Sequence, residues 1–332
     1  MNIKASQKRE NIEKEDFAVK IHRKSSLEKA KEIVARDGLL PVKNDYIFAN
    51  LFGSKKHKEL LVCLLNSILD GKPHVKDLTL APTEYKKTTP DGKTVRLDVA
   101  AVSDDGTILH VEIQTQDEGN IGDRASFYQS VLREGELKEG EDYSSIPDII
   151  SIWIVAEPVT DRRACYHEIV SMYKANGVDP IQIASEKMRQ FIIELPKLEA
   201  TPKRFINRMF EAWVKFIRDP ENIPPELLEI PEVKEAMDAL TYMSADPDVR
   251  AAYQARIREM NRIRASQAIK YKEGLAEGEK RERARAEKRE RQLVEKAKAE
   301  KIESAKTALS MGLSIYQVSE ITGLSIEEVK KL

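Results

Sequence analysis

The sequence predicts an α/β protein in which a mixed β-sheet is flanked by helices and followed by a helical C-terminal region. Residues 96–114 have the pattern of two short strands joined by an Asp-Asp-Gly turn at 104–106. Residues 149–156, IISIWIVA, form an almost uninterrupted apolar run, which is typical of a central strand buried on both faces. From Thr201 onward, apolar residues recur at helical spacing.

The first helical region spans residues 44–70, where leucine, isoleucine and phenylalanine recur at helical spacing. Gly53-Ser54 interrupts the pattern, so two helices are predicted. Asp45 lies at the start of the region, where the helix dipole favours a carboxylate. A basic turn at residues 55–58 follows, and it suits either phosphate contacts or a solvated loop.

The remaining elements of the predicted sheet follow in order along the chain. A strand around residues 78–85 and a turn at 89–92 lead into the hairpin, so the first three strands are expected to form an antiparallel meander. A helix is expected over residues 123–139. Further strands are expected at 165–173 and 189–195.

The hairpin carries the residues with the clearest chemistry. Because side chains alternate along a strand, His110, Glu112 and Gln114 share one face, and Asp98 can meet Glu112 at the open end of the ladder. Two such carboxylates repel each other, and a divalent cation such as Mg²⁺ removes that repulsion. Gln114 can orient a water or a phosphate but cannot act as a base. The same residues also suit the solvated face of a one-sided antiparallel sheet, so spacing leaves both interpretations open.

Asp98, the interval to Val111, and Glu112-Ile113-Gln114 resemble the PD-(D/E)XK nuclease pattern, with Gln114 where the lysine normally stands. The wider sequence, over residues 38–260 and the tail, resembles the recombination-promoting nucleases, or PD-(D/E)XK nuclease family transposases. The other matching segments are 40–48 with 51–53, Arg96-Leu97-Asp98-Val99, Arg124 with Tyr128, 143–150, and Glu194-Leu195-Pro196-Lys197.

The resemblance implies a restriction-endonuclease-like (PD-(D/E)XK) fold and an Mg²⁺-dependent DNA endonuclease, with Mn²⁺ as a substitute ion, that promotes recombination or transposition of mobile DNA. It implies that Asp98 and Glu112 bind the metal and that Gln114 completes the catalytic group. Related nucleases often carry a third acidic group on the first helix, and Asp45 is the candidate here.

Arg124 and Tyr128 are the expected supporting residues. They lie four residues apart and therefore share one face of the predicted helix. An arginine offers a bidentate fork to a phosphate, while core packing is the commoner role for a tyrosine at such a position. Ala49 stands where the family commonly has lysine, so no phosphate contact is expected at that position.

Two other functions remain open from the sequence. The chain could be a non-catalytic DNA-binding or assembly protein, a remnant of a mobile element that keeps the nuclease core as a scaffold. It could also be an RNA-directed nuclease. Metal binding separates the first alternative from the endonuclease, and a preference for single-stranded RNA over duplex DNA would support the second.

Composition divides the chain into segments. These are a charged N-terminal extension (1–38), a nuclease-like core (39–200), a helical extension (201–261), a charged helical linker (262–304) and a small helix-turn-helix-like tail (305–332). The linker lacks a heptad seam, which favours a spacer or a weak oligomerisation arm. The tail could read DNA or make protein contacts, and acidic residues at the start of its last helix disfavour the former.

The overall composition argues against a strongly basic nucleic-acid-binding protein, a disulfide-rich protein and a membrane-spanning protein. Lys and Arg number 55 against 56 Asp and Glu, so net charge gives no nucleic-acid signal. The cysteines, Cys63 and Cys165, indicate a reducing compartment without a disulfide framework. Charged first residues and the lack of a membrane-length apolar stretch predict a cytoplasmic protein without a membrane partner. The expected partners are DNA and a second copy of the chain, bound through the C-terminal helical region.

Overall fold

The computed structural model describes residues 26–70, 73–85, 95–116, 119–134, 136–137, 139–169 and 188–332. The chain divides into two compact units, one ending at Arg256 and one spanning Ile257–Leu332. The strands of the first unit are β1 Leu78–Leu80, β2 Glu84–Tyr85, β3 Val95–Arg96, β4 Val99–Ser103, β5 Ile108–Gln114, β6 Ile149–Val155, β7 Tyr166–Ile169 and β8 Met188–Glu194.

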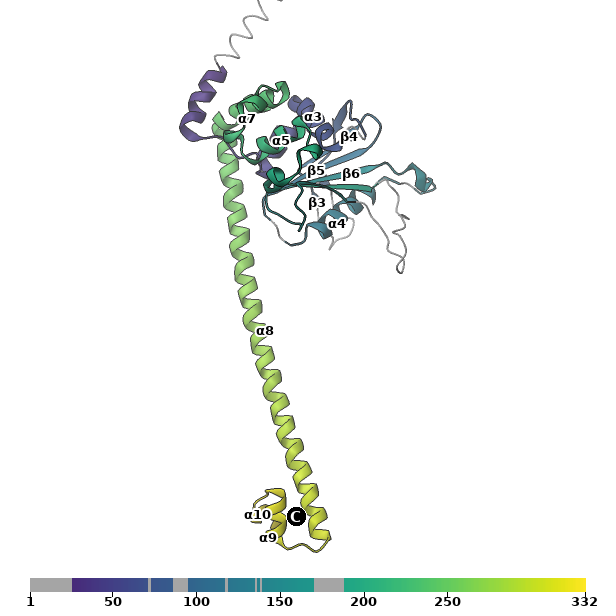
Figure 1. Ribbon diagram of the computed structural model, residues 1–332, viewed down its shortest axis with the longest axis vertical. Coiled ribbons are helices and arrows are strands. Elements are labelled where there is room, and N and C mark those ends of the chain that lie inside the picture. The colour runs from purple at the N-terminus through teal and green to yellow at the C-terminus, as the bar shows by residue number, and fades with distance from the viewer. Residues whose placement is uncertain are drawn as a thin grey trace, which may run out of the picture. The chain divides into compact units, whose positions relative to one another are not determined.

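Six of these strands form a mixed sheet in the order β1-β4-β5-β6-β8-β7, and β2 pairs with β3 separately (Figure 1). Strands β1, β4 and β5 are antiparallel, β5, β6 and β8 are parallel, and β7 is an antiparallel edge strand. With its flanking helices and the helical region that follows, the sheet confirms the predicted fold class.

The predicted hairpin is formed by β4 and β5. Its register pairs Val99 with Val111. At the turn, the Gly106 amide donates to the Ser103 carbonyl at 3.0 Å, and Gly106 has a φ of 86°, a conformation that side chains other than glycine's rarely adopt. The Asp-Asp-Gly signal therefore predicted the turn correctly, and β1 completes the expected meander.

The strand predicted to run from residue 96 through 102 is divided, and so is the one predicted over residues 78–85. Residues 95–96 pair with β2 in the small sheet, and the Leu97 amide donates to the Thr83 carbonyl at 2.8 Å. Residues 99–103 belong to the main sheet. Asp98 therefore lies at the point where the chain passes from one sheet to the other. The turn predicted at 89–92 lies outside the described residues.

The helices of the first unit, with the first residues of α8, cover both faces of the sheet. They include α2 Asp45–Phe52, α3 Lys58–Leu69, α4 Ile121–Glu134, α5 Arg208–Arg218, α6 Pro225–Leu228, α7 Pro231–Ala245 and α8 Pro247–Ser310, with short 3₁₀ segments η1 Lys55–His57, η2 Tyr143–Ser145, η3 Leu195–Ala200, η4 Lys203–Phe205 and η5 Pro220–Asn222. Residues 26–37 are helical as well. The predicted break at Gly53 is confirmed. The helix predicted over 123–139 ends earlier, at Glu134. Residues 170–173 of the strand predicted to begin at 165 lie outside the described residues.

Two hydrophobic clusters pack against the sheet. One joins sheet residues such as Val111 and Ile113 to Phe48, Phe52 and Trp213 of α2 and α5. The other joins sheet residues on the opposite face to α4. Figure 1 shows α4 on one side of the sheet and α3, α5 and α7 on the other. All of β6 is buried, which confirms the prediction that the apolar run is a central strand.

The second unit contains most of α8 and the short helices α9 Ile315–Thr322 and α10 Ile326–Lys330. Ser314 and Ser325 each cap a helix through a capping box, a pattern that the sequence of the tail already contains. A small core of Ala305, Val318 and Val329 holds the last helices together. Of the helices within the described residues, none is long and apolar enough to cross a membrane. The five-part division of the chain stays a prediction.

Candidate active site

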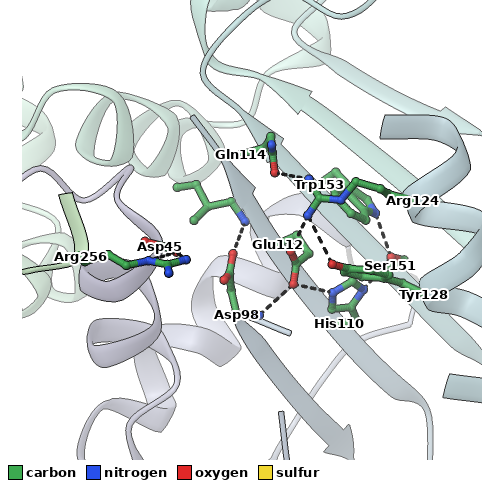
Figure 2. Close-up of polar contacts among 11 residues, drawn as sticks. Asp45, Asp98, His110, Glu112, Gln114, Arg124, Tyr128, Ser151, Trp153 and Arg256 are labelled. Atoms are coloured by element: carbon green, nitrogen blue, oxygen red, sulfur yellow. Dashed lines mark hydrogen bonds and ion pairs between the residues drawn. The ribbon is translucent and has the colours of Figure 1, made fainter. Parts of the chain in front are cut away.

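The register of the hairpin brings Asp98 and Glu112 together (Figure 2). The backbone amide of Asp98 donates to Oε1 of Glu112 at 2.8 Å. In return, the backbone amide of Ile113 donates to Oδ2 of Asp98 at 2.9 Å. Each carboxylate is therefore held by the backbone of the opposite segment, and the break before β4 is what frees the Asp98 amide for this bond.

Burial governs the charge of the two carboxyls. It raises the pKa of Glu112 to about 7, although the Asp98 amide and Arg124 act in the opposite direction. Burial and the neighbouring Glu112 also raise the pKa of Asp98 well above its ordinary value. Two buried like charges are costly, so the pair favours either a bound proton or a cation.

Each carboxylate keeps one oxygen outside the two hydrogen bonds that join the segments. Among the described residues, Oδ1 of Asp98 accepts no hydrogen bond, and Oε2 of Glu112 has only Arg124 at 3.9 Å. No three His, Cys, Asp or Glu side chains within the described residues cluster as an all-protein metal site. Mg²⁺ commonly takes one or two carboxylates and completes its shell with water and phosphate oxygens. The two residues fit such an ion.

Arg124 of α4 lies beside the pair and links the other predicted residues. Its guanidinium donates to Oε1 of Gln114 at 2.8 Å and to the hydroxyl of Tyr128 at 3.3 Å. It also lies 5.4 Å from the ring of Trp153 and 5.6 Å from that of Tyr128. Tyr128 is buried in the core, as one of its two interpretations expected, and its hydroxyl contacts Arg124, whereas its supporting role in catalysis stays a prediction.

Asp45 stands apart from this group. Asn44, not Asp45, caps α2, and Asp45 occupies the first helical position. Its Oδ2 forms an ion pair with Arg256 of α8, whose Nε lies 2.9 Å away. Asp45 raises the pKa of Asp98 and Glu112 through its charge but does not join their hydrogen bonds. Its role as a third acid stays a prediction and would require Arg256 to leave.

The sequence pattern missed a buried polar group behind Glu112, made by His110, Ser151 and Trp153. Nε2 of His110 lies 3.1 Å from Oε1 of Glu112, and its Nδ1 lies 2.8 Å from the hydroxyl of Ser151. Burial, with the charge of Arg124, lowers the pKa of His110 to about 3. Alternation placed His110 on the face of Glu112, but only the parallel β5–β6 register pairs it with Ser151.

The fold and the site together define a mixed α/β protein whose sheet carries two adjacent carboxylates and a neighbouring arginine. An antiparallel hairpin of two inner strands presents two carboxylates close to where β4 begins, and a flanking helix adds a cation, an arrangement consistent with the PD-(D/E)XK fold. The model of the PD-(D/E)XK nuclease family transposases matches residues 42–265, so the chain belongs to this family. This confirms the resemblance found in the motifs. No curated protein and no solved structure matches the chain. PD-(D/E)XK nucleases generally use divalent metals.

Proposed function

We propose that this protein is an Mg²⁺-dependent DNA endonuclease that promotes recombination or transposition of mobile DNA. Family membership supports the nuclease class. The observation that carries the proposal is the convergence of Asp98 and Glu112, the first half-buried and the second buried, each with a carboxylate oxygen that no described amide or hydroxyl occupies. Such a pair is costly to build without a cation to bind it.

Asp98 and Glu112 would hold the ion through these oxygens. A divalent ion at this position supplies Lewis-acid polarisation of the phosphodiester and a water that ionises near neutral pH. Gln114 orients the water or the phosphate through its amide. Arg124 faces the developing negative charge of the phosphate, where a fixed cation contributes most.

Cleavage of supercoiled plasmid by the purified protein tests this proposal. Nicking is expected with Mg²⁺ or Mn²⁺, and EDTA is expected to abolish it. Asp98→Asn and Glu112→Gln preserve shape but remove charge, and each is expected to lower the rate at least about 100-fold. The matched control is Asp105→Asn, which changes a carboxylate at the other end of the same hairpin.

Equal nicking by wild type and both variants would sink the assignment of this site. A folded protein that binds DNA but cleaves with neither metal would favour the non-catalytic DNA-binding or assembly role. Faster cleavage of single-stranded RNA than of duplex DNA would favour an RNA-directed nuclease. Family membership favours DNA over RNA as the substrate, because a transposase acts on DNA.

A further inference from the structure

A buried chain of hydrogen bonds leads from β6 to the carboxylate of Glu112. Nε1 of Trp153 lies 3.1 Å from the Ser151 hydroxyl, that hydroxyl lies 2.8 Å from Nδ1 of His110, and Nε2 of His110 lies 3.1 Å from Oε1 of Glu112. The three residues before the carboxylate have no solvent exposure. Figure 2 shows them stacked behind Glu112, on the side away from Asp98.

When Glu112 is ionised, as it would be with a cation bound, the chain has a single direction that satisfies each of its polar atoms. An indole N–H can only donate, so the Ser151 oxygen accepts from Trp153. The Ser151 hydrogen then goes to Nδ1 of His110, which places the hydrogen of the neutral ring on Nε2, facing Glu112. The opposite tautomer would turn a nitrogen lone pair toward a carboxylate and leave the buried serine hydrogen without an acceptor.

The His110 ring is also held by packing. Its centroid lies 5.8 Å from that of Tyr128 and 5.9 Å from that of Trp153, the latter at an interplanar angle of 88°. Rotation of the ring would therefore disturb both aromatic neighbours. The tautomer and the orientation of the imidazole are consequently determined together.

Glu112 receives two donors on one oxygen. Oε1 accepts from His110 and from the Asp98 amide, whereas Oε2 has only the Arg124 ion pair at 3.9 Å. We propose that His110 is a positioning residue, held by Ser151 and Trp153, that occupies Oε1 of Glu112 and thereby presents Oε2 alone to the divalent ion. This inference rests on the proposed function and specifies how its carboxylate binds.

Two substitutions of His110 separate this role from a purely structural one. In His110→Gln, the side-chain amide can reach the place of Nε2 and still donate to Glu112. In His110→Asn, the amide reaches only the place of Nδ1, so it keeps Ser151 but leaves Oε1 with a single donor. The control is Ser67→Ala, which removes a buried hydroxyl from α3, far along the chain from the site.

Calorimetric titration with Mn²⁺ measures the effect without relying on cleavage, and thermal unfolding checks that each variant folds. His110→Asn is expected to weaken ion binding about 10- to 100-fold, whereas His110→Gln stays within about threefold of wild type. Equal affinity of wild type and folded His110→Asn would overturn the positioning role. Absence of ion binding by wild type would instead overturn the proposed function, and this inference with it.

Nitrogen NMR of the protein labelled at histidine tests the hydrogen-bond chain without any metal. His110 is expected to appear as the Nε2–H tautomer, and Ser151→Ala is expected to shift it toward a mixture. A wild-type spectrum with the hydrogen on Nδ1 would overturn the inference, even if the protein cleaves DNA.

Discussion

A positive charge beside the Asp98–Glu112 pair comes from a helix, in the side chain of Arg124, and not from the strand. Gln114 occupies the strand position of the usual lysine, and its carbonyl oxygen accepts from Arg124 at 2.8 Å. A lysine there could not accept this bond and would repel the guanidinium. At the residue scale, Gln114 and Arg124 are therefore mutually consistent, and the departure from the motif has a physical explanation.

Arg124→Ala is expected to slow plasmid nicking about 100- to 1000-fold without weakening Mn²⁺ binding. In this variant the phosphate would lose the positive charge of Arg124. Asp98 and Glu112 would lose the guanidinium that competes with the metal ion for their negative charge. Arg124→Lys keeps the charge but not the fork, so an intermediate rate is expected. Nicking kinetics and calorimetry measure the two effects. Arg133→Ala, on the same helix, is the control, and weaker ion binding by Arg124→Ala would mean that Arg124 organises the carboxylates.

The end of β8 carries a second buried carboxylate, and it organises a neighbouring loop. Glu194 accepts from the Val159 amide at 2.7 Å, the Thr160 amide at 3.0 Å and Nζ of Lys197 at 2.7 Å. His167 of β7 adds a contact at 2.8 Å. At the scale of elements, Glu194 therefore joins β8, β7 and the loop after β6.

That loop begins beside the candidate active site, because the Ala156 amide donates to the Gln114 carbonyl at 2.9 Å. Lys197 also donates to the Thr160 carbonyl at 2.6 Å, which closes the structure around Glu194. The family-like segment Glu194-Leu195-Pro196-Lys197 is thus explained by the loop it holds.

Glu194→Gln is expected to destabilise the fold by roughly 3 to 5 kcal/mol near neutral pH, because it leaves Lys197 without its buried partner. Burial opposes ionisation of Glu194, but the donors from Lys197, Thr160 and Val159 outweigh it and lower the pKa to about 2. Since the folded pKa is depressed, this stabilisation is present above the ordinary value of 4.5 and is lost as pH falls toward 2.

Urea unfolding of wild type and Glu194→Gln at several pH values measures this difference. The difference in free energy of unfolding between wild type and Glu194→Gln should be constant near neutral pH and should decrease at acidic pH. The control is Glu199→Gln, which breaks the surface pair with Arg218 and is expected to cost under about 1 kcal/mol. If Glu194→Gln and Glu199→Gln lost equal free energy of unfolding, the buried position of Glu194 would add no stability beyond that of a surface ion pair.

At the scale of the whole molecule, the site links folding to protons and metal. The pKa of Glu112 is about 7 in the folded protein against an ordinary value of 4.5, and that of Asp98 is raised as well. A carboxyl with a raised folded pKa stabilises the fold fully below its unfolded pKa, and the contribution disappears as pH rises through the folded value. Under the proposed function, a bound cation would replace the proton at higher pH.

Metal-free wild type is therefore expected to lose roughly 2 to 4 kcal/mol of unfolding free energy between about pH 5 and about pH 8. Mg²⁺ at about 100 times its dissociation constant should restore about 2.7 kcal/mol at the upper pH. Thermal unfolding with EDTA or Mg²⁺ measures both effects. Glu112→Gln, which cannot ionise at this position, should show a flatter pH profile and little response to Mg²⁺. If the stability of wild type depended steeply on pH but did not respond to Mg²⁺, the proposed coupling between the protons and the metal ion would be contradicted.

Local patterns in the sequence were sufficient for the hairpin turn at 104–106, the helix break at Gly53 and the capping boxes of the tail. These features depend on backbone preferences within a few residues, so a short stretch of sequence encodes them. The meeting of Asp98 and Glu112 follows in the same way from alternation and a short turn.

Contacts between distant segments came only from the tertiary structure. The strand break before β4 depends on the pairing of β3 with β2. The hydrogen bond of His110 to Ser151 depends on the parallel register of β5 and β6. The ion pair of Asp45 with Arg256 depends on the packing of α8. Registers between non-adjacent strands and the docking of helices are decided by packing of the whole core, which no short pattern contains.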